Sequence, residues 1–435
     1  DREVQLRHQL LEEFLPKYLK IINYHFMNNV NLSELRDVPI KIIWAVAFLT
    51  IMGLVVLKSI SQHHVGDVFQ NPFTKQLFFL IPAVLLSILI LITPRYTIHK
   101  YAYALYAIGV FIVLMPFLGN PHAGTYRWLN IGLPFAIQPS EFAKVFTLIA
   151  LARYLSDYNL QMKKFSSIIL PILLAMLPTI IVLNQPDLGT AIIMMTPVLP
   201  MLYWAGARPF HLFLILTPLF SMLTAFHSLA FTVWAIVLGI SIFLARPKPL
   251  ISLALFFGNI FIGLLSPILW NSLSKYQQSR VLTFINPEKD PLGAAYQIIQ
   301  SKTAIGSGGL FGKGWGEGTQ THLKFLPVQE SDFILSVMGE EFGFISILIV
   351  LLVLGFFIIQ ILKRSFLSKD RFSSIALIGF ASIFMAHVFV NTAMTVGLIP
   401  VKGLPFPFIS AGGSFLLSCY IMIGLILKLS VNYSE

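Results

Sequence analysis

Residues 342–361 read FGFISILIVLLVLGFFIIQI, a run of twenty residues without a charged side chain. A helix of about 20 apolar residues is long enough to cross the hydrocarbon core of a bilayer, which is about 30 Å thick. Apolar runs of similar length recur along the whole chain. These runs must be helical, because lipid offers no hydrogen-bond partner to backbone N–H and C=O groups.

The composition leads to the same class of protein. Of the 435 residues, 56% are hydrophobic and only 11% are charged, whereas about a quarter of the residues of a soluble domain are charged. So few charges cannot cover the surface of a water-soluble globule. We therefore predict an all-α polytopic membrane protein. The net charge of +11 does not indicate a nucleic-acid partner, because the basic residues lie in short loops between the apolar runs.

We expect about twelve transmembrane helices. Their predicted ranges are 40–57, 76–94, 99–118, 140–155, 166–184, 188–205, 210–226, 228–245, 249–270, 333–361, 373–398 and 411–430. Cytoplasmic loops are normally rich in Lys and Arg. One alternate set of loops here carries Arg36, Lys41, Arg95, Lys100, Arg153, Lys163, Lys164, Arg208, Arg246, Lys248, Lys363, Arg364, Lys369 and Arg371.

This charge pattern predicts that both termini are cytoplasmic and that residues 1–39 form a cytoplasmic N-terminal segment without a cleavable signal peptide. It also predicts one large extracytoplasmic loop, residues 271–332. Long ordered loops in compact proteins are usually functional. We therefore expect chemistry on the outer face.

Residues 138–144, Gln-Pro-Ser-Glu-Phe-Ala-Lys, begin the fourth predicted span. Ser140 is expected to cap this helix. Glu141 and Lys144 are three residues apart, so they share a helix face and can form an ion pair. Such a pair is either a local structural feature or part of a functional site, because ionisable groups inside a span are costly.

Residues 184–190, Asn-Gln-Pro-Asp-Leu-Gly-Thr, predict a tight turn between two spans. Asp187 lies at the start of a helix, where the helix dipole favours an anion. It is therefore expected to cap that helix. The alternative is that Asp187 is a partner for Lys144 across the bundle.

The outer loop contains a second acidic candidate. Asp290-Pro291 predicts a turn that is followed by a helix running through Lys302. Asp290 either caps that helix or accepts a proton from a sugar hydroxyl. Arg280 and Lys302 offer positive charge for a phosphate.

Two further stretches are rich in glycine and proline. Residues 306–318 do not fit a nucleotide-binding loop, because Ser307 and Gly314 stand where that motif needs Gly and Ser or Thr. Residues 391–414 interrupt the last two spans, and they form either a re-entrant turn or the rim of a substrate groove. The sequence contains no metal-binding signature.

Together these stretches resemble the SEDS family (shape, elongation, division and sporulation), nearest to its RodA-like members. The resemblance extends in order and spacing over residues 40–430, although an apparent extra hairpin at 210–245 departs from the ten spans common in the family. It makes residues 40–435 a SEDS-type membrane domain. The motifs that carry it are Arg127-Trp128, residues 138–144, residues 185–190, Asp290-Pro-Leu-Gly with Tyr296-Gln297, and residues 403–413.

The resemblance implies a peptidoglycan glycosyltransferase that polymerises lipid II for cell-wall elongation and rod shape. It implies an inverting reaction on a donor linked to undecaprenyl pyrophosphate. Asp290 matches the essential acidic residue of the family's outer loop, so we expect it to be the general base. The residues expected to contact pyrophosphate or sugar are Arg127, Trp128, Lys144, Arg280, Gln297 and Lys302.

The sequence requires no cofactor, although the resemblance allows a divalent cation, Mg or Mn. It implies a class B penicillin-binding protein transpeptidase and other membrane proteins of the elongation complex as partners, in the bacterial inner membrane. Two alternatives remain. One is a flippase or transporter of lipid-linked precursors, because broken helices and buried charge also suit alternating access. The other is a non-catalytic scaffold of the cell-wall machinery.

Overall fold

The structure is a computed structural model. It describes residues 37–63, 71–119, 125–130, 136–157, 160–245, 249–272, 278, 282, 295–323 and 325–431. The regular structure of these residues is helical, with an isolated antiparallel bridge between Leu129 and Ile137. The all-α prediction is therefore confirmed for the described part of the chain.

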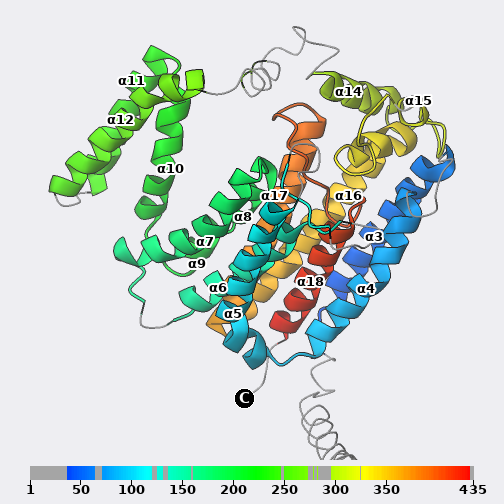
Figure 1. Cartoon of the computed structure of the whole chain (residues 1–435), viewed down its shortest axis with the longest axis horizontal. Helices are drawn as coiled ribbons and strands as arrows, with labels where there is room; N and C mark the ends of the chain where they lie inside the picture. The colour runs from blue at the N-terminus through cyan, green and yellow to red at the C-terminus, as the bar shows by residue number, and fades with distance from the viewer. Residues whose placement is uncertain are drawn as a thin grey trace, which may run out of the picture.

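Each of the twelve predicted ranges contains helix (Figure 1). The helices are α3 (Ile40–Ile60), α4 (Pro72–Ile92), α5 (Arg95–Leu114), α6 (Pro139–Leu155), α7 (Ser166–Asn184), α8 (Leu188–Met195), α9 (Val198–Trp204), α10 (Pro209–Thr224), α11 (Ser228–Ala245), α12 (Pro249–Ser272), α14 (Tyr296–Gly308), α15 (Thr319–His322), α16 (Ile334–Leu367), α17 (Arg371–Thr395) and α18 (Gly413–Ser430). Within the described residues, nine helices are long and apolar enough to cross a membrane, so the protein is a multi-pass membrane protein. The count of twelve stays a prediction.

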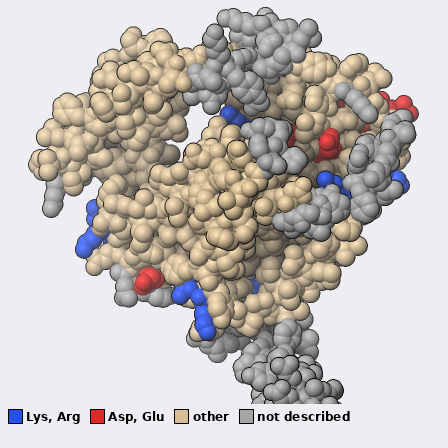
Figure 2. All heavy atoms as spheres, in the orientation of Figure 1, with Lys and Arg blue, Asp and Glu red and all other residues tan. Residues whose placement is uncertain are grey.

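The loops that were predicted to share one side of the membrane do meet in the structure. Arg95 forms an ion pair with Asp370 (N–O 3.3 Å) and donates a hydrogen bond to the carbonyl of Val431. Arg371 donates to the carbonyl of Ala205. Figure 1 shows this end of the bundle at the bottom, with α14 and α15 at the top. In Figure 2 the charged side chains gather toward the upper right and the lower left margin, and the surface between them is uncharged.

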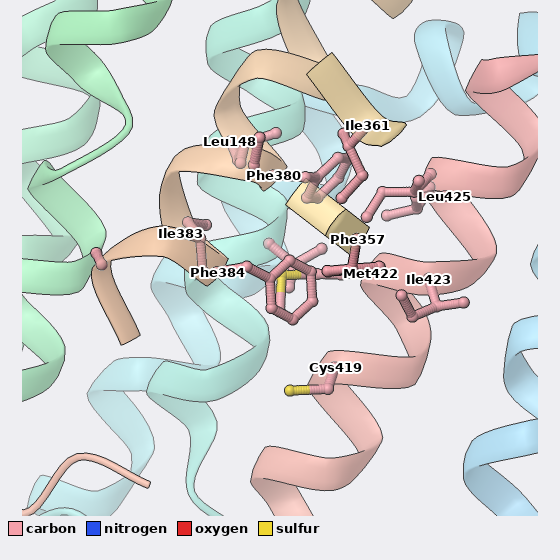
Figure 3. Close-up of a cluster of buried hydrophobic side chains, with 14 of the residues drawn as sticks. Leu148, Phe357, Ile361, Phe380, Ile383, Phe384, Cys419, Met422, Ile423 and Leu425 are labelled. Carbon is pink, nitrogen blue, oxygen red and sulfur yellow. The ribbon is translucent and has the colours of Figure 1, made fainter. Parts of the chain in front are cut away.

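Four helices form the centre of the apolar core. Figure 3 shows side chains of α6, α16, α17 and α18 meeting around Phe357 and Phe384. The rings of Phe357 and Phe384 lie 5.2 Å apart in an edge-to-face arrangement, and Phe408 stacks on Phe384 at 5.4 Å. Because Phe408 belongs to the segment between α17 and α18, the core also fixes that segment.

Helices α10, α11 and α12 form a separate lobe beside the main bundle (Figure 1). The predicted extra hairpin corresponds to α10 and α11. Hydrogen bonds hold the three helices together: Trp234 Nε1 donates to Ser221 Oγ (2.8 Å), and Ser221 Oγ donates to Asn259 Oδ1 (3.2 Å). Hydrogen bonds of this kind link helices that have no hydrophobic driving force between them in lipid.

Helix α16 is interrupted at Gly343, whose φ of 77° and ψ of 177° are non-helical. The break exposes backbone groups that the helix would otherwise pair. The loop after α14 satisfies them. Four backbone hydrogen bonds join the two segments: Lys313 N to Glu340 O (2.9 Å), Gly314 N to Glu341 O (3.0 Å), Phe344 N to Gly309 O (2.9 Å) and Ile345 N to Leu310 O (3.2 Å).

We predict that Gly343→Ala destabilises the fold by about 2 kcal/mol or more, because this backbone conformation is essentially restricted to glycine. A Cβ at Gly343 would also lie 2.3 Å from the carbonyl oxygen of Leu310. The matched control is Gly355→Ala on the same helix, where a Cβ meets nothing within 4 Å. Thermal unfolding of the purified proteins measures the effect. Equal melting temperatures for both variants would contradict the prediction.

Candidate functional site

Four segments meet at the end of the bundle opposite Val431. They are residues 126–130 with 136–138, the turn at 185–188, the turn at 328–333 and the segment 397–411. A guanidinium N–H of Arg127 donates to the carbonyl of Pro186. The amide of Ala411 donates to the carbonyl of Glu330 at 2.8 Å. These contacts bring Arg127 beside the 185–190 motif, and the 403–413 motif beside the 328–333 turn. The Asp290-Pro-Leu-Gly motif lies outside the described residues.

Asp332 lies where the 328–333 turn meets the 397–411 segment. Its backbone carbonyl accepts a hydrogen bond from Asn391 Nδ2 (3.0 Å), whose amide also donates to Leu404 O (2.7 Å). Ser331 Oγ donates to Asp332 Oδ1 at 2.9 Å. Burial raises the pKa of Asp332 to about 6, and the neighbouring charge of Glu330 adds to this. The Ser331 hydrogen bond and the Arg127 guanidinium act in the opposite direction.

Glu141 and Lys144 form the predicted ion pair. Lys144 Nζ lies 2.6 Å from Glu141 Oε2, and both side chains are buried. Lys144 Nζ also lies 3.2 Å from Nε2 of His387 on α17. The structure places the Lys144 ammonium inside the protein among α6, α17 and α18. That Lys144 contacts substrate stays a prediction.

The predicted cap of α6 is wrong. The helix begins at Pro139, so Gln138 occupies the cap position and Ser140 lies inside the first turn. Ser140 Oγ is buried without a hydrogen-bond partner among the described residues. The backbone amide of Gln138 donates instead to Ser414 Oγ at 3.0 Å. The start of α6 is therefore held by the first turn of α18.

Asp187 caps α8, as predicted. Its carboxylate accepts hydrogen bonds from the backbone amide of Thr190 (3.1 Å) and from the Thr190 hydroxyl (2.8 Å). It also accepts one from Gln138 Nε2 at 3.0 Å. The alternative that Asp187 pairs with Lys144 does not hold in this structure, because Lys144 uses Glu141.

Of the remaining predicted contacts, the structure describes Trp128, Gln297 and Lys302. Trp128 is 41% exposed, and Gln297 and Lys302 lie on α14. The Lys302 side chain passes beside Gly397, where a Cβ would lie 2.6 Å from its Cε. Ser301 anchors α14 by donating to the carbonyl of Thr395 at 2.6 Å. Asp290 and Arg280 lie outside the described residues.

Sequence reasoning did not single out several ionisable side chains that the structure encloses: Glu340, Glu341, His387 and Lys428 are buried, and the partly exposed Asp332 has a raised pKa. The carboxylate of Glu340 accepts hydrogen bonds from Lys313 Nζ (2.8 Å), the amides of Gln320 and Thr321, and two hydroxyls. It thereby fixes the loop before α15. Acidic and histidine side chains inside predicted spans were the available signal, because such groups are costly in lipid.

A divalent cation needs several oxygen ligands. Among the residues that the structure describes, no group of three or more His, Cys, Asp or Glu side chains is placed to hold a metal ion. The described part of the site therefore does not supply a protein-built metal centre.

Comparison with known proteins places the chain in a family. The FtsW/RodA/SpoVE family model, described as "Cell cycle protein", matches residues 40–239 and 229–435. Similar proteins include the peptidoglycan glycosyltransferase MrdB of Escherichia coli K12, which is 33% identical over 80% of this chain and 82% of its own length. The peptidoglycan glycosyltransferase RodA of Treponema pallidum is 32% identical over 88% of this chain and 95% of its own.

Solved structures share the fold. A chain of a structure titled "Structural coordination of polymerization and crosslinking by a peptidoglycan synthase complex" superposes with a TM-score of 0.68 and 25% identity, covering 90% of this chain and 97% of that chain. The rod shape determining protein RodA of Thermus thermophilus has a TM-score of 0.58 and 23% identity, covering 91% of this chain and 97% of its own. The chain belongs to the FtsW/RodA/SpoVE family, the SEDS family that its motifs resemble.

Proposed function

We propose that this protein is a peptidoglycan glycosyltransferase that polymerises lipid II for cell-wall elongation and rod shape. The observation that carries the proposal is its similarity, over most of both chains, to two proteins named peptidoglycan glycosyltransferase. The geometry supports it, because Arg127, Asp187 and the 397–411 segment lie at one end of an apolar bundle. A lipid-linked substrate keeps its tail in the bilayer and its sugar in water, so its enzyme needs polar groups at such a boundary.

In the proposed reaction, the 4-hydroxyl of the acceptor sugar attacks the anomeric carbon of the donor. The Asp290 carboxylate takes the hydroxyl proton as general base. A C–O bond forms at the anomeric carbon while the bond from that carbon to the pyrophosphate oxygen breaks. Undecaprenyl pyrophosphate leaves with the bonding electrons. A single displacement of this kind inverts the configuration.

Positive charge near the leaving group stabilises the pyrophosphate. We assign this role to Arg127, Arg280 and Lys302, because a guanidinium binds phosphate oxygens with paired N–H groups and an ammonium binds them as a point charge. The exposed face of Trp128 is suited to contact a sugar ring. Gln297, on the same helix as Lys302, is suited to bind sugar hydroxyls.

A divalent cation, Mg²⁺ or Mn²⁺, belongs to the proposal only as a counter-ion of the pyrophosphate, and no step is assigned to it. We propose a class B penicillin-binding protein as partner, since a similar chain occurs in a peptidoglycan synthase complex. Other membrane proteins of the elongation complex would join it. The proposed location is the bacterial inner membrane with both termini cytoplasmic, which follows from the Lys and Arg placement.

We predict that Asp290→Asn lowers polymerisation by about 10²-fold or more, because the amide cannot accept the hydroxyl proton. The matched control is Glu288→Gln, which removes a neighbouring carboxylate and should leave the rate within a few-fold of wild type. The measurement is glycan strand length and yield from purified protein and lipid II. Retained activity in Asp290→Asn sinks the catalytic assignment. Lipid II translocation without product would favour the flippase alternative.

Asp332 gives a prediction about pH. Its raised pKa means that the folded protein holds this proton more tightly than the unfolded chain, so the stability it contributes is present below pH 4 and is lost as the pH rises through about 6. We predict that Asp332→Asn, which stays neutral, is more stable than wild type at pH 7.5 by up to about 3 kcal/mol. The gain should shrink toward pH 4.

Melting temperatures at several pH values measure this difference. The control is Glu317→Gln, which changes an exposed carboxylate and should give a difference from wild type that is small at every pH. A gain for Asp332→Asn that is the same at pH 4 and pH 7.5 would show that the carboxyl of Asp332 does not ionise in this range.

A further inference from the structure

The ammonium of Lys144 has three N–H groups, and the structure provides a partner for each. One partner is Glu141 Oε2 at 2.6 Å. The second is His387 Nε2 at 3.2 Å. The third is the ring of Phe415, whose centroid lies 5.0 Å from Nζ. Because the lysine side chain is fully buried, these contacts replace all of its hydration.

These contacts determine the protonation of His387. An ammonium has only donors, so Nε2 of His387 must be an unprotonated acceptor. On the other side of the ring, Nδ1 lies 3.3 Å from the carbonyl oxygen of Pro405, which only accepts. With Lys144 as an ammonium, these two contacts fit a neutral ring whose proton is on Nδ1.

The same ring links the interior of the bundle to the outer face. Pro405 belongs to the 397–411 segment, which is held against the 328–333 turn by the Ala411–Glu330 backbone hydrogen bond. That turn carries Asp332. The Asn391 amide donates hydrogen bonds to the backbone carbonyls of Asp332 and of Leu404, the residue before Pro405. The position of Pro405 is therefore coupled to the position of the site.

Besides its own helix α17, helices α6 and α18 place charged, polar or aromatic groups near the His387 imidazole. Helix α6 supplies Lys144 and, behind it, Glu141, whose Oε2 is also 3.0 Å from Ser418 Oγ. Helix α18 supplies Ser418 and the ring of Phe415, which lies 4.9 Å from the imidazole. Protonation of Nε2 would place a second cation against Lys144 and remove its acceptor.

We propose that His387 is a positioning residue. Its neutral ring is a spacer of fixed length between the buried Lys144 ammonium and the Pro405 carbonyl. It thereby fixes the distance of the 397–411 segment from Lys144, and so the position of this segment at the outer site. The proposal rests on the proposed function for its catalytic readout. It assigns no contact between His387 and substrate.

Two near-isosteric substitutions separate the two contacts. In His387→Asn the amide nitrogen takes the place of Nδ1 and can donate to Pro405, but nothing reaches Lys144. In His387→Gln the amide oxygen takes the place of Nε2 and can accept from Lys144, but the contact with Pro405 is lost. His387→Leu removes both contacts. The full-length proteins are compared by KM and kcat for lipid II and by melting temperature.

We expect KM to rise about fivefold in His387→Gln, the effect of one lost hydrogen bond, with kcat changed less than about twofold. KM should stay near the wild-type value in His387→Asn. The melting temperature should fall further in His387→Asn than in His387→Gln, because in His387→Asn the Lys144 ammonium loses its acceptor. His387→Leu should show both effects. Equal KM changes in Asn and Gln, the reverse order, or unchanged KM in all three would overturn the proposal.

A second measurement does not depend on activity. The ¹⁵N spectrum of histidine-labelled protein, with the His387 signals identified by their loss in His387→Gln, should show a protonated Nδ1 and an unprotonated Nε2 at neutral pH. A protonated Nε2 would overturn the spacer. A wild-type protein that makes no glycan would instead overturn the proposed function, while the spectrum and the melting temperatures would still decide the spacer.

Discussion

A charged side chain among apolar helices must find every one of its partners inside the protein, because no water can supply them. The Lys144 ammonium shows how far this constraint shapes the molecule. Its partners come from α6, α17 and α18. Those three helices also supply most of the aromatic and aliphatic side chains of the central core (Figure 3). The buried charge and the apolar core therefore hold the same helices in the same register.

At the outer end of the bundle, the same need for internal hydrogen-bond partners applies to backbone that is not helical. Segments without helical hydrogen bonds persist near a membrane only when protein groups pair them. Asn391 does this for the carbonyls of Asp332 and Leu404, and Gln138 Nε2 and Thr190 do it for the Asp187 carboxylate. The described loops that carry motif residues are therefore held to one another by hydrogen bonds. Such rigidity is the condition for holding a substrate in one geometry.

The sequence was sufficient for the fold class, because hydropathy and the absence of charge report directly on a membrane environment. It also predicted the Glu141–Lys144 pair, whose three-residue spacing needs only one helix. It could not predict the contact between Lys144 and His387, which are 243 residues apart. The burial of Asp332 likewise depends on segments distant in the chain.

Local rules failed in two places for physical reasons. Ser140 is a good capping residue, but Pro139 starts the helix one residue earlier, and Ser414 in the first turn of α18 accepts the Gln138 amide instead. Gly343 is the second residue of the apolar run 342–361, whose composition suits an unbroken helix, and the hydrogen bonds from residues 309–314 pair the backbone groups at the break. Asp290 and Arg280 lie outside the described residues, so their roles stay predictions.

The break in α16 also has a consequence for biogenesis. Residues 308–314 are synthesised before residues 340–345, so the loop that closes the break has already left the ribosome when the interrupted helix emerges. Until the two meet, the carbonyls of Glu340 and Glu341 and the amides of Phe344 and Ile345 lack their partners. Lateral release of α16 into lipid while these backbone groups lack hydrogen bonds would be costly. Insertion of α16 together with α14 and its loop would avoid this cost.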